Sequence, residues 1–158
     1  MDSDLSLQGE AMVERLKIVL SQQDFLARQG VQLIVHSPLL RARRTCLGIF
    51  GSDGVAGGGS AGSVPVEQHD LLYEQSVKET VGLGDMSVRV RQVTAWLLQR
   101  SESCICVVGH SAFFRAMLAP AAVHPNNCDV WHVELKSDGT CANARRVVEG
   151  GTALLAPS

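Results

Sequence analysis

Two short apolar runs constrain the fold of this chain more than any other feature. They are Val31 to Val35 (VQLIV) and Cys104 to Val108 (CICVV). Short runs rich in β-branched residues are typical of strands buried on both faces of a parallel sheet. Each run leads directly into polar residues, His36-Ser37 in the first case and Gly109-His110 in the second. Because the carboxyl ends of parallel strands meet at one edge of a sheet, both polar segments are expected at the same pocket.

Segments with helical spacing alternate with these strands. Helices are predicted over about residues 6–28, 37–50 and 87–99, with Ser6 and Ser37-Pro38 starting the first two. A short strand is predicted at residues 64–66, and residues 130–135 and 142–148 are expected to pair around a turn at Asp138-Gly139. The alternation predicts an α/β fold, a three-layer α/β/α sandwich with a mainly parallel sheet.

The composition fits one domain that spans residues 1–158. Hydrophobic residues make up 46%, charged residues 19%, and the formal net charge is -2. We therefore expect a folded chain, with no electrostatic reason for a nucleic-acid partner. No run reaches the ~18 apolar residues that a membrane span needs, and the N-terminus is no secretory signal. The five cysteines include no C-x-x-C pair, so we expect reduced thiols, no zinc site and a cytoplasmic protein.

Residues 51–63 (GSDGVAGGGSAGS) are of low complexity, which predicts a flexible surface loop. A phosphate-cradling loop is the alternative. The loop contains no lysine, which a Walker-type motif needs.

Three polar segments are candidates for chemistry. Arg41 lies near the predicted start of a helix, where backbone N–H groups attract anions and a guanidinium can grip a phosphate. His110 directly follows the second strand and is well placed to stabilise a phosphoryl group. Glu74 follows an apolar pair, where it can act as a general acid. Each has a plain alternative: solvated arginines on a capped helix, a structural histidine, or an exposed loop glutamate.

Taken together, these segments resemble the histidine phosphatase (phosphoglycerate mutase-like) superfamily. SPLLRARRT resembles the S-P-L-x-R-A-x-x-T signature of that family, and GHSAFFRAML resembles its second histidine motif with the helix that follows. Asp4-Leu5-Ser6 with Gly9, Glu74 with Gly82, and the segment from Asn126 to Val130 resemble shorter stretches. The resemblance runs in the family's order from residue 4 to about residue 148.

The resemblance implies roles for individual residues. Arg41, with Ser37 and Ser111, matches the residues that bind the phosphate of the substrate. His110 matches the histidine that stabilises the transferring group, and Glu74 matches the proton donor, although Glu79 remains an alternative. The substrate implied is a small phosphorylated molecule or a phosphoprotein, and no cofactor is implied.

One part of the family's pattern is absent. The family's nucleophile is a histidine in an N-terminal Arg-His-Gly motif at the end of a central strand, and this sequence contains no such motif. His36 precedes Ser-Pro and does not occupy the nucleophile's position. We therefore expect no activity from this chain alone.

Three explanations of the missing strand are open. The chain is an incomplete version of a longer protein, or its sheet closes up with residues 31–35 and 104–108 side by side, or another chain supplies a strand. For function, the alternatives are a phosphatase or mutase domain without its first strand, a phosphate-binding or regulatory pseudoenzyme, and an unrelated α/β interaction domain. The last of these requires Arg41 and His110 to lie far apart.

Overall fold

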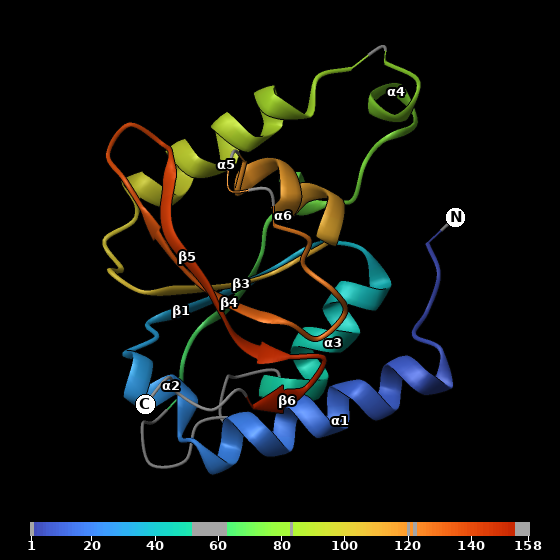
Figure 1. Ribbon diagram of the computed structural model, residues 1–158, viewed down its shortest axis with the longest axis vertical. Helices are drawn as coiled ribbons and strands as arrows, with labels where there is room; N and C mark the ends of the chain where they lie inside the picture. The colour runs from blue at the N-terminus through green and yellow to red at the C-terminus, as the bar shows by residue number, and fades with distance from the viewer. Residues whose placement is uncertain (1, 52–62, 83, 120, 122, 154–158) are drawn as a thin grey trace.

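The computed structural model describes residues 2–51, 63–82, 84–119, 121 and 123–153 (Figure 1). Within them, a parallel sheet has β1 (Leu33–His36) at its centre, with β2 (Val66–Gln68) on one side and β3 (Ile105–Val108) on the other. The register aligns Leu33 with Ile105 and His36 with Val108. The two apolar runs of the sequence are therefore neighbouring parallel strands that end at the same edge, as predicted.

A second sheet is antiparallel. Its order is β4 (Val130–Leu135), β5 (Cys141–Glu149) and β6 (Thr152–Ala153). The predicted hairpin between β4 and β5 is confirmed, and Gly139 has a positive φ of 83° in its turn. That backbone conformation favours glycine, so the Asp138-Gly139 signal was informative.

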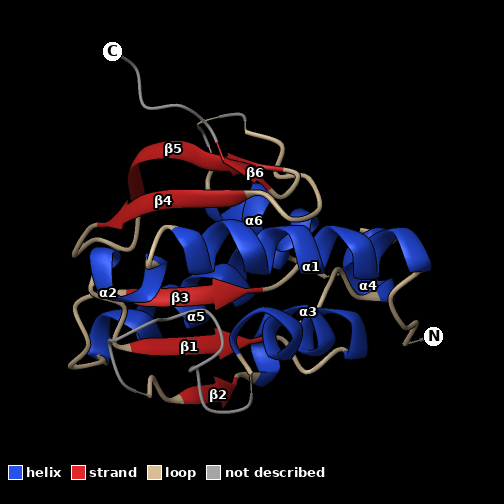
Figure 2. Ribbon diagram, turned by 90° about the horizontal axis from the view of Figure 1, so that it is seen from below, coloured by secondary structure: helices blue, strands red, loops and turns tan. Residues whose placement is uncertain are grey.

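Helices cover both faces of the parallel sheet (Figure 2). On one face lie α1 (Leu7–Gln22) and α3 (Leu40–Phe50), and on the other lie α5 (Met86–Gln99) and α6 (Ser111–Met117). The shorter helices are α2 (Phe25–Gln29), the 3-10 turn η1 (Asp70–Leu72) and α4 (Val77–Thr80). The three-layer α/β/α arrangement that the alternation predicted is therefore present, with an antiparallel sheet beside the parallel one.

The side chains around β3 alternate between the two helical layers. Cys104, Cys106 and Val108 pack with the core beneath α1 and α3, whereas Ile105 and Val107 pack with the core beneath α5 and α6. Successive side chains of a strand point to opposite faces, so a run without polar residues requires a helix on each side. Cys104 and Cys106, two positions apart, therefore lie on the same face of the sheet.

The first predicted helix is interrupted. It ends at Gln22, and Asp24 adopts a left-handed conformation with φ 48° before α2 begins at Phe25. This turn allows Leu26, which is 1% exposed, to reach the core. Ser6 does cap α1, because its side chain accepts a hydrogen bond from the backbone N–H of Gly9. Gly30 ends α2 in a left-handed conformation, as expected of a helix C-terminus.

Other predicted boundaries shift by a few residues. The helix expected from Ser37 begins at Leu40, so Ser37 is not its cap. The strand expected at residues 64–66 is β2, at Val66–Gln68. Within the loop predicted at residues 51–63, residues 52–62 lie outside the described part of the chain. Among the described residues, no helix is long and apolar enough to cross a bilayer.

The two sheets meet without hydrogen-bonding to each other. In Figure 2, β4 follows β3 in the order of the strands, but within the described residues β3 pairs with β1 alone and β4 pairs with β5 alone. One cluster of apolar side chains under α1 nevertheless includes Cys106 of β3, Val130 of β4 and Val148 of β5. The strands at 31–35 and 104–108 do lie side by side. The strands still do not form one continuous sheet, because no hydrogen bonds are described between β3 and β4.

Candidate anion-binding site

A hydrogen bond joins the segments that follow β1 and β3. The side-chain oxygen of Ser37, just past β1, lies 2.8 Å from Nε2 of His110, just past β3. Both residues are buried. The Ser37 hydroxyl also accepts a hydrogen bond from the backbone N–H of Leu39 at 3.2 Å, which leaves its own proton free to be donated to Nε2. The residues of the two motifs, 73 positions apart in the sequence, therefore form one site.

Arg41 lies in the first turn of α3 at the border of this site. Its guanidinium pairs with the carboxylate of Glu74 and also donates to Ser3 Oγ at 3.1 Å. Arg41 lies close enough to His110 for its charge to lower the pKa of that histidine. The alternative of an unrelated α/β interaction domain requires Arg41 and His110 to lie far apart. The structure places them near each other, which disfavours that alternative.

His110 is held in its neutral form. Burial, together with the positive charges of Arg41 and Arg89, lowers its pKa from 6.5 to about 4, while Asp2 acts in the opposite direction. At neutral pH the imidazole is therefore uncharged and forms its hydrogen bond with Ser37. A phosphate dianion beside the ring would favour the charged form and add a strong, charge-assisted hydrogen bond.

Other candidate nucleophiles are not poised for reaction. His36 is buried, and its Nδ1 donates to the carbonyl of Ser37 at 2.8 Å. Burial raises the pKa of the thiols of Cys46 and Cys106 to about 12, and it also raises the pKa of the other three cysteines. A thiolate is the reactive form of cysteine, so all five are poor nucleophiles at neutral pH.

Glu74 and Glu79, which the sequence could not distinguish, occupy different environments. The Glu74 carboxylate reaches Arg41 at the site, with 41% of its side chain exposed. The Glu79 carboxylate is buried and binds the guanidinium of Arg89, and it also accepts the backbone N–H of Ser76 at 2.7 Å. Its pKa is lowered chiefly by the hydrogen bond from Arg89. Of the two, Glu74 is the carboxylate that faces the candidate site.

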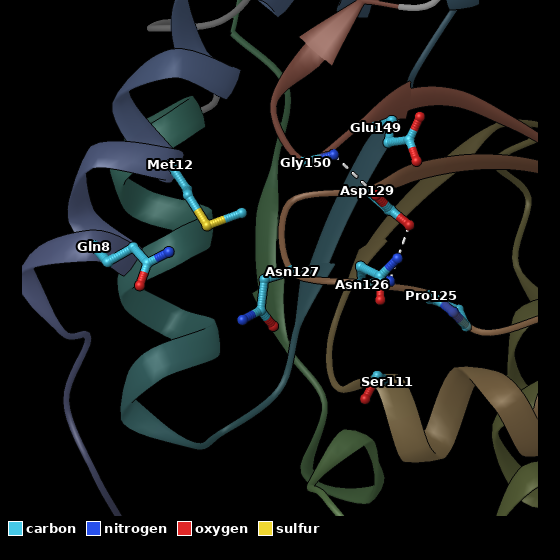
Figure 3. Close-up of a pocket in the computed structure, with 9 residues that line it drawn as sticks. All are labelled: Gln8, Met12, Ser111, Pro125, Asn126, Asn127, Asp129, Glu149 and Gly150. Atoms are coloured by element: carbon cyan, nitrogen blue, oxygen red, sulfur yellow. Dashed lines mark hydrogen bonds between the residues drawn. The ribbon is translucent and has the colours of Figure 1, made fainter.

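Ser111 begins α6 and lines a cavity of about 410 Å³ (Figure 3). Gln8 and Met12 of α1 face this space from the opposite side, and Asn126 and Asn127 lie along it. Asp129 fixes the asparagine segment, because its two carboxylate oxygens accept the backbone N–H groups of Gly150 and Asn126, both at 2.9 Å. The residues that line the cavity come from α1, the start of α6, the segment before β4 and the end of β5.

An acidic group already sits at the N-terminus of α3. Both carboxylate oxygens of Asp2 accept the backbone N–H of Leu40, at 2.9 and 3.0 Å. The positive end of a helix dipole and its unpaired N–H groups favour such an anion. The helix start beside Arg41 is therefore already binding an anionic group of the chain itself.

The described residues contain no group of three or more His, Cys, Asp or Glu side chains arranged to hold a metal ion. What the site offers is a guanidinium, helix N–H groups, a hydroxyl and a neutral imidazole. These groups bind an oxyanion by hydrogen bonds and charge.

Comparison with solved structures shows that the chain has a known fold. The chain superposes on Bacillus stearothermophilus YhfR with a TM-score of 0.62 and 17% identity, over 94% of this chain and 85% of that chain. The mycobacterial glucosyl-3-phosphoglycerate phosphatase gives a TM-score of 0.64 and 18% identity, over 97% and 90% of the respective chains. A putative α-ribazole-5'-phosphate phosphatase from Escherichia coli gives 0.59 and 15%, over 98% and 88%.

The chain has the phosphoglycerate mutase-like fold. No protein-family model and no curated protein matches its sequence. At identities of 15–18%, the likeness to solved structures extends to the fold alone.

Sequence reasoning missed one residue that the structure ties to this site. Arg89 of α5 is buried and contacts the segment that carries Glu74. A signal was present, because Arg89 stands four residues before the buried Val93, on the inner face of its helix. A charged residue at that spacing needs a partner inside the protein.

Proposed function

We propose that this chain is a phosphate-binding member of the histidine phosphatase superfamily that does not transfer phosphate by itself. Arg41, Ser37 and His110 bind the phosphate group of the ligand, with Ser111 at the adjoining cavity. Glu74, beside Arg41, is the proton donor in a form of the protein that carries the nucleophile. The ligand is a small phosphorylated molecule or a phosphoprotein in the cytoplasm. The observation that carries the proposal is the 2.8 Å contact between Ser37 and His110, which joins two strand ends beside Arg41.

The chemistry of the converging groups supports an anion ligand. A guanidinium at a helix N-terminus supplies charge and several N–H donors, and a phosphate accepts both. The anionic Asp2 at the N–H of Leu40 occupies part of the same surface. Two neighbours of similar fold carry names that describe phosphatases of small phosphorylated molecules, which favours the same ligand class here.

The absence of turnover is the second part of the proposal. The sequence has no Arg-His-Gly motif, and neither the cysteines nor His36 are poised as substitutes. In the described residues β3 and β4 belong to separate sheets. This arrangement supports the proposal that an additional strand, carried by a longer form of the protein, lies between them. In that longer form, the same site serves phosphate ester hydrolysis or phosphoryl transfer, which is the second candidate function.

Calorimetric titration with inorganic phosphate tests the binding site. Wild type should bind, and Arg41→Ala should lose about thirtyfold or more in affinity, since a hydrogen bond to a charged group contributes about 2 kcal/mol and each 1.4 kcal/mol is tenfold. Arg43→Ala is the matched control, because Arg43 is an exposed residue of the same helix. No binding by wild type, or equal binding by Arg41→Ala, would refute the site.

Hydrolysis of an aryl phosphate tests the second part. The chain as given should show no turnover, whereas a version extended upstream by a strand ending in Arg-His-Gly should. Robust turnover by the short chain, lost on His110→Ala, would show that a nucleophile is present after all.

A further inference from the structure

A single buried guanidinium, that of Arg89 on α5, organises the segment that carries Glu74. It donates to the backbone carbonyls of Leu71 and Tyr73, at 2.9 and 2.5 Å, and to that of Glu74 at 3.3 Å. It also forms two hydrogen bonds with the Glu79 carboxylate, at 3.1 and 2.9 Å. The guanidinium therefore binds both ends of the segment from residue 71 to residue 79.

Aromatic packing fixes the plane of this guanidinium. Its carbon lies 4.0 Å from the centre of the Tyr73 ring and 5.1 Å from that of Phe113, a fully buried residue of α6. Phe113 lies three residues after His110, which is the N-cap of α6. Arg89 thus connects the helix that follows His110 with the loop that carries Glu74.

We propose that Arg89 is a positioning residue, which holds Glu74 against Arg41 and thereby sets how tightly the site binds phosphate. This inference rests on the proposed phosphate site. Glu74 neutralises the guanidinium that an incoming phosphate needs, and two anions repel each other at one cation. Phosphate can bind Arg41 only when the Glu74 carboxylate leaves the guanidinium. Because Arg89 fixes the backbone of the Glu74 segment, Arg89 influences how readily Glu74 leaves.

The chemistry of arginine explains why a lysine cannot replace Arg89 in this role. Five N–H donors in a fixed plane serve three carbonyls and one carboxylate at once, whereas an ammonium group has three donors and no plane. Arg89→Lys keeps the positive charge opposite Glu79 and near His110. It removes the planar fork that fixes the carbonyls of residues 71, 73 and 74.

A double-mutant cycle on phosphate affinity tests the proposal. Glu74→Gln removes the competing charge and should raise the affinity for inorganic phosphate about tenfold. Arg89→Lys alone should raise it about threefold, because Glu74 is held less firmly. In the Glu74→Gln background, Arg89→Lys should have no further effect. Arg91→Lys is the matched control on α5, since the Arg91 side chain donates to Ser87 Oγ at 3.3 Å and is near Asp85, and neither residue belongs to the proposed site.

A purely structural role for Arg89 gives a different pattern. Arg89→Lys would then change phosphate affinity equally in both backgrounds, or would not change it at all, and either result would overturn the proposal. Thermal unfolding of each variant shows whether the protein remains folded at the temperature of the titration.

A second measurement separates this inference from the proposed function. ¹⁵N NMR of the Arg41 side chain, without phosphate, should show guanidinium rotation that is restricted in wild type and free in both Glu74→Gln and Arg89→Lys. If wild type and Glu74→Gln bind no phosphate, the proposed site fails, and restored rotation in Arg89→Lys still establishes that Arg89 positions Glu74. If rotation in Arg89→Lys stays restricted, the positioning role is wrong whatever the titration shows.

Discussion

Two arginine–glutamate pairs lie at the two ends of one short loop, and they differ in exposure. The pair of Arg89 and Glu79 is buried, with side chains 5% and 7% exposed. The pair of Arg41 and Glu74 is partly open, with side chains 33% and 41% exposed. The buried arginine has further bonds to three carbonyls, whereas the open one has Ser3 as its only other described side-chain partner.

The difference indicates which pair is structural and which can exchange partners. A buried charge cannot leave its partner without a large desolvation penalty, so Glu79 is committed to Arg89. A pair in contact with water exchanges at little cost, so Arg41 can release Glu74 and accept an incoming anion. The two glutamates lie five positions apart and have the same chemistry, and their different burial assigns them different roles.

The largest expected effect concerns the buried pair. Arg89→Met should lower the free energy of unfolding by about 3–5 kcal/mol, because it leaves Glu79 buried without its partner. Arg41→Met should cost at most about 1 kcal/mol, because its pair is open to solvent. Urea denaturation at pH 7 measures both. Arg89→Met combined with Glu79→Met should restore part of the loss, and equal losses for Arg89→Met and Arg41→Met would erase the distinction between the pairs.

The next effect concerns His110, whose pKa is lowered by burial and by both arginines. Between pH 6.5 and about 4 the unfolded chain binds a proton at this residue that the folded chain does not, so stability is complete above pH 6.5 and is lost as the pH falls. The loss should approach roughly 3 kcal/mol at pH 4. Urea denaturation of wild type and His110→Gln across this range measures it.

His110→Gln should flatten most of that pH dependence. A remainder should come from His69, whose pKa burial also lowers, and, near the acid end of the range, from Glu79, whose pKa the hydrogen bond from Arg89 lowers. His132→Gln, which changes an exposed histidine of β4, is the matched control and should keep the wild-type slope. An unchanged slope in His110→Gln would mean that the folded protein takes up the proton at His110 as readily as the unfolded chain does.

The smallest expected effect tests whether a second carboxylate, besides that of Glu74, competes with phosphate beside Arg41. Asp2 binds the N–H of Leu40 at the start of α3, beside Arg41, and nothing comparable is described around Arg89. Asp2→Asn should raise the affinity for inorganic phosphate about threefold at low salt, and less in 0.5 M salt, because exposed charges are screened. Calorimetry at the two salt concentrations measures it. A gain that salt leaves unchanged would exclude an electrostatic origin.

Much of the fold was predictable because its signals are local. The runs at 31–35 and 104–108 required burial on both faces, and the helix of residues 86–99 and the hairpin at Gly139 followed from spacing and turn chemistry. The break at Asp24 was not predictable, since the apolar spacing of residues 12–26 suits a straight helix equally well. Ser37 is not the cap of α3, because the helix begins three residues later, at Leu40; its hydroxyl instead forms a hydrogen bond with a residue 73 positions away.

The sequence by itself determined that the motifs of Arg41 and His110 follow strands, and therefore that they meet at one edge of a sheet. Only the tertiary structure decided which glutamate joins them. Glu74 and Glu79 have the same side chain and nearly the same place in the chain, and the sequence does not encode their exposure locally. Exposure depends on α5 and α6 packing around Arg89, and that packing buries Glu79 and leaves Glu74 at the site.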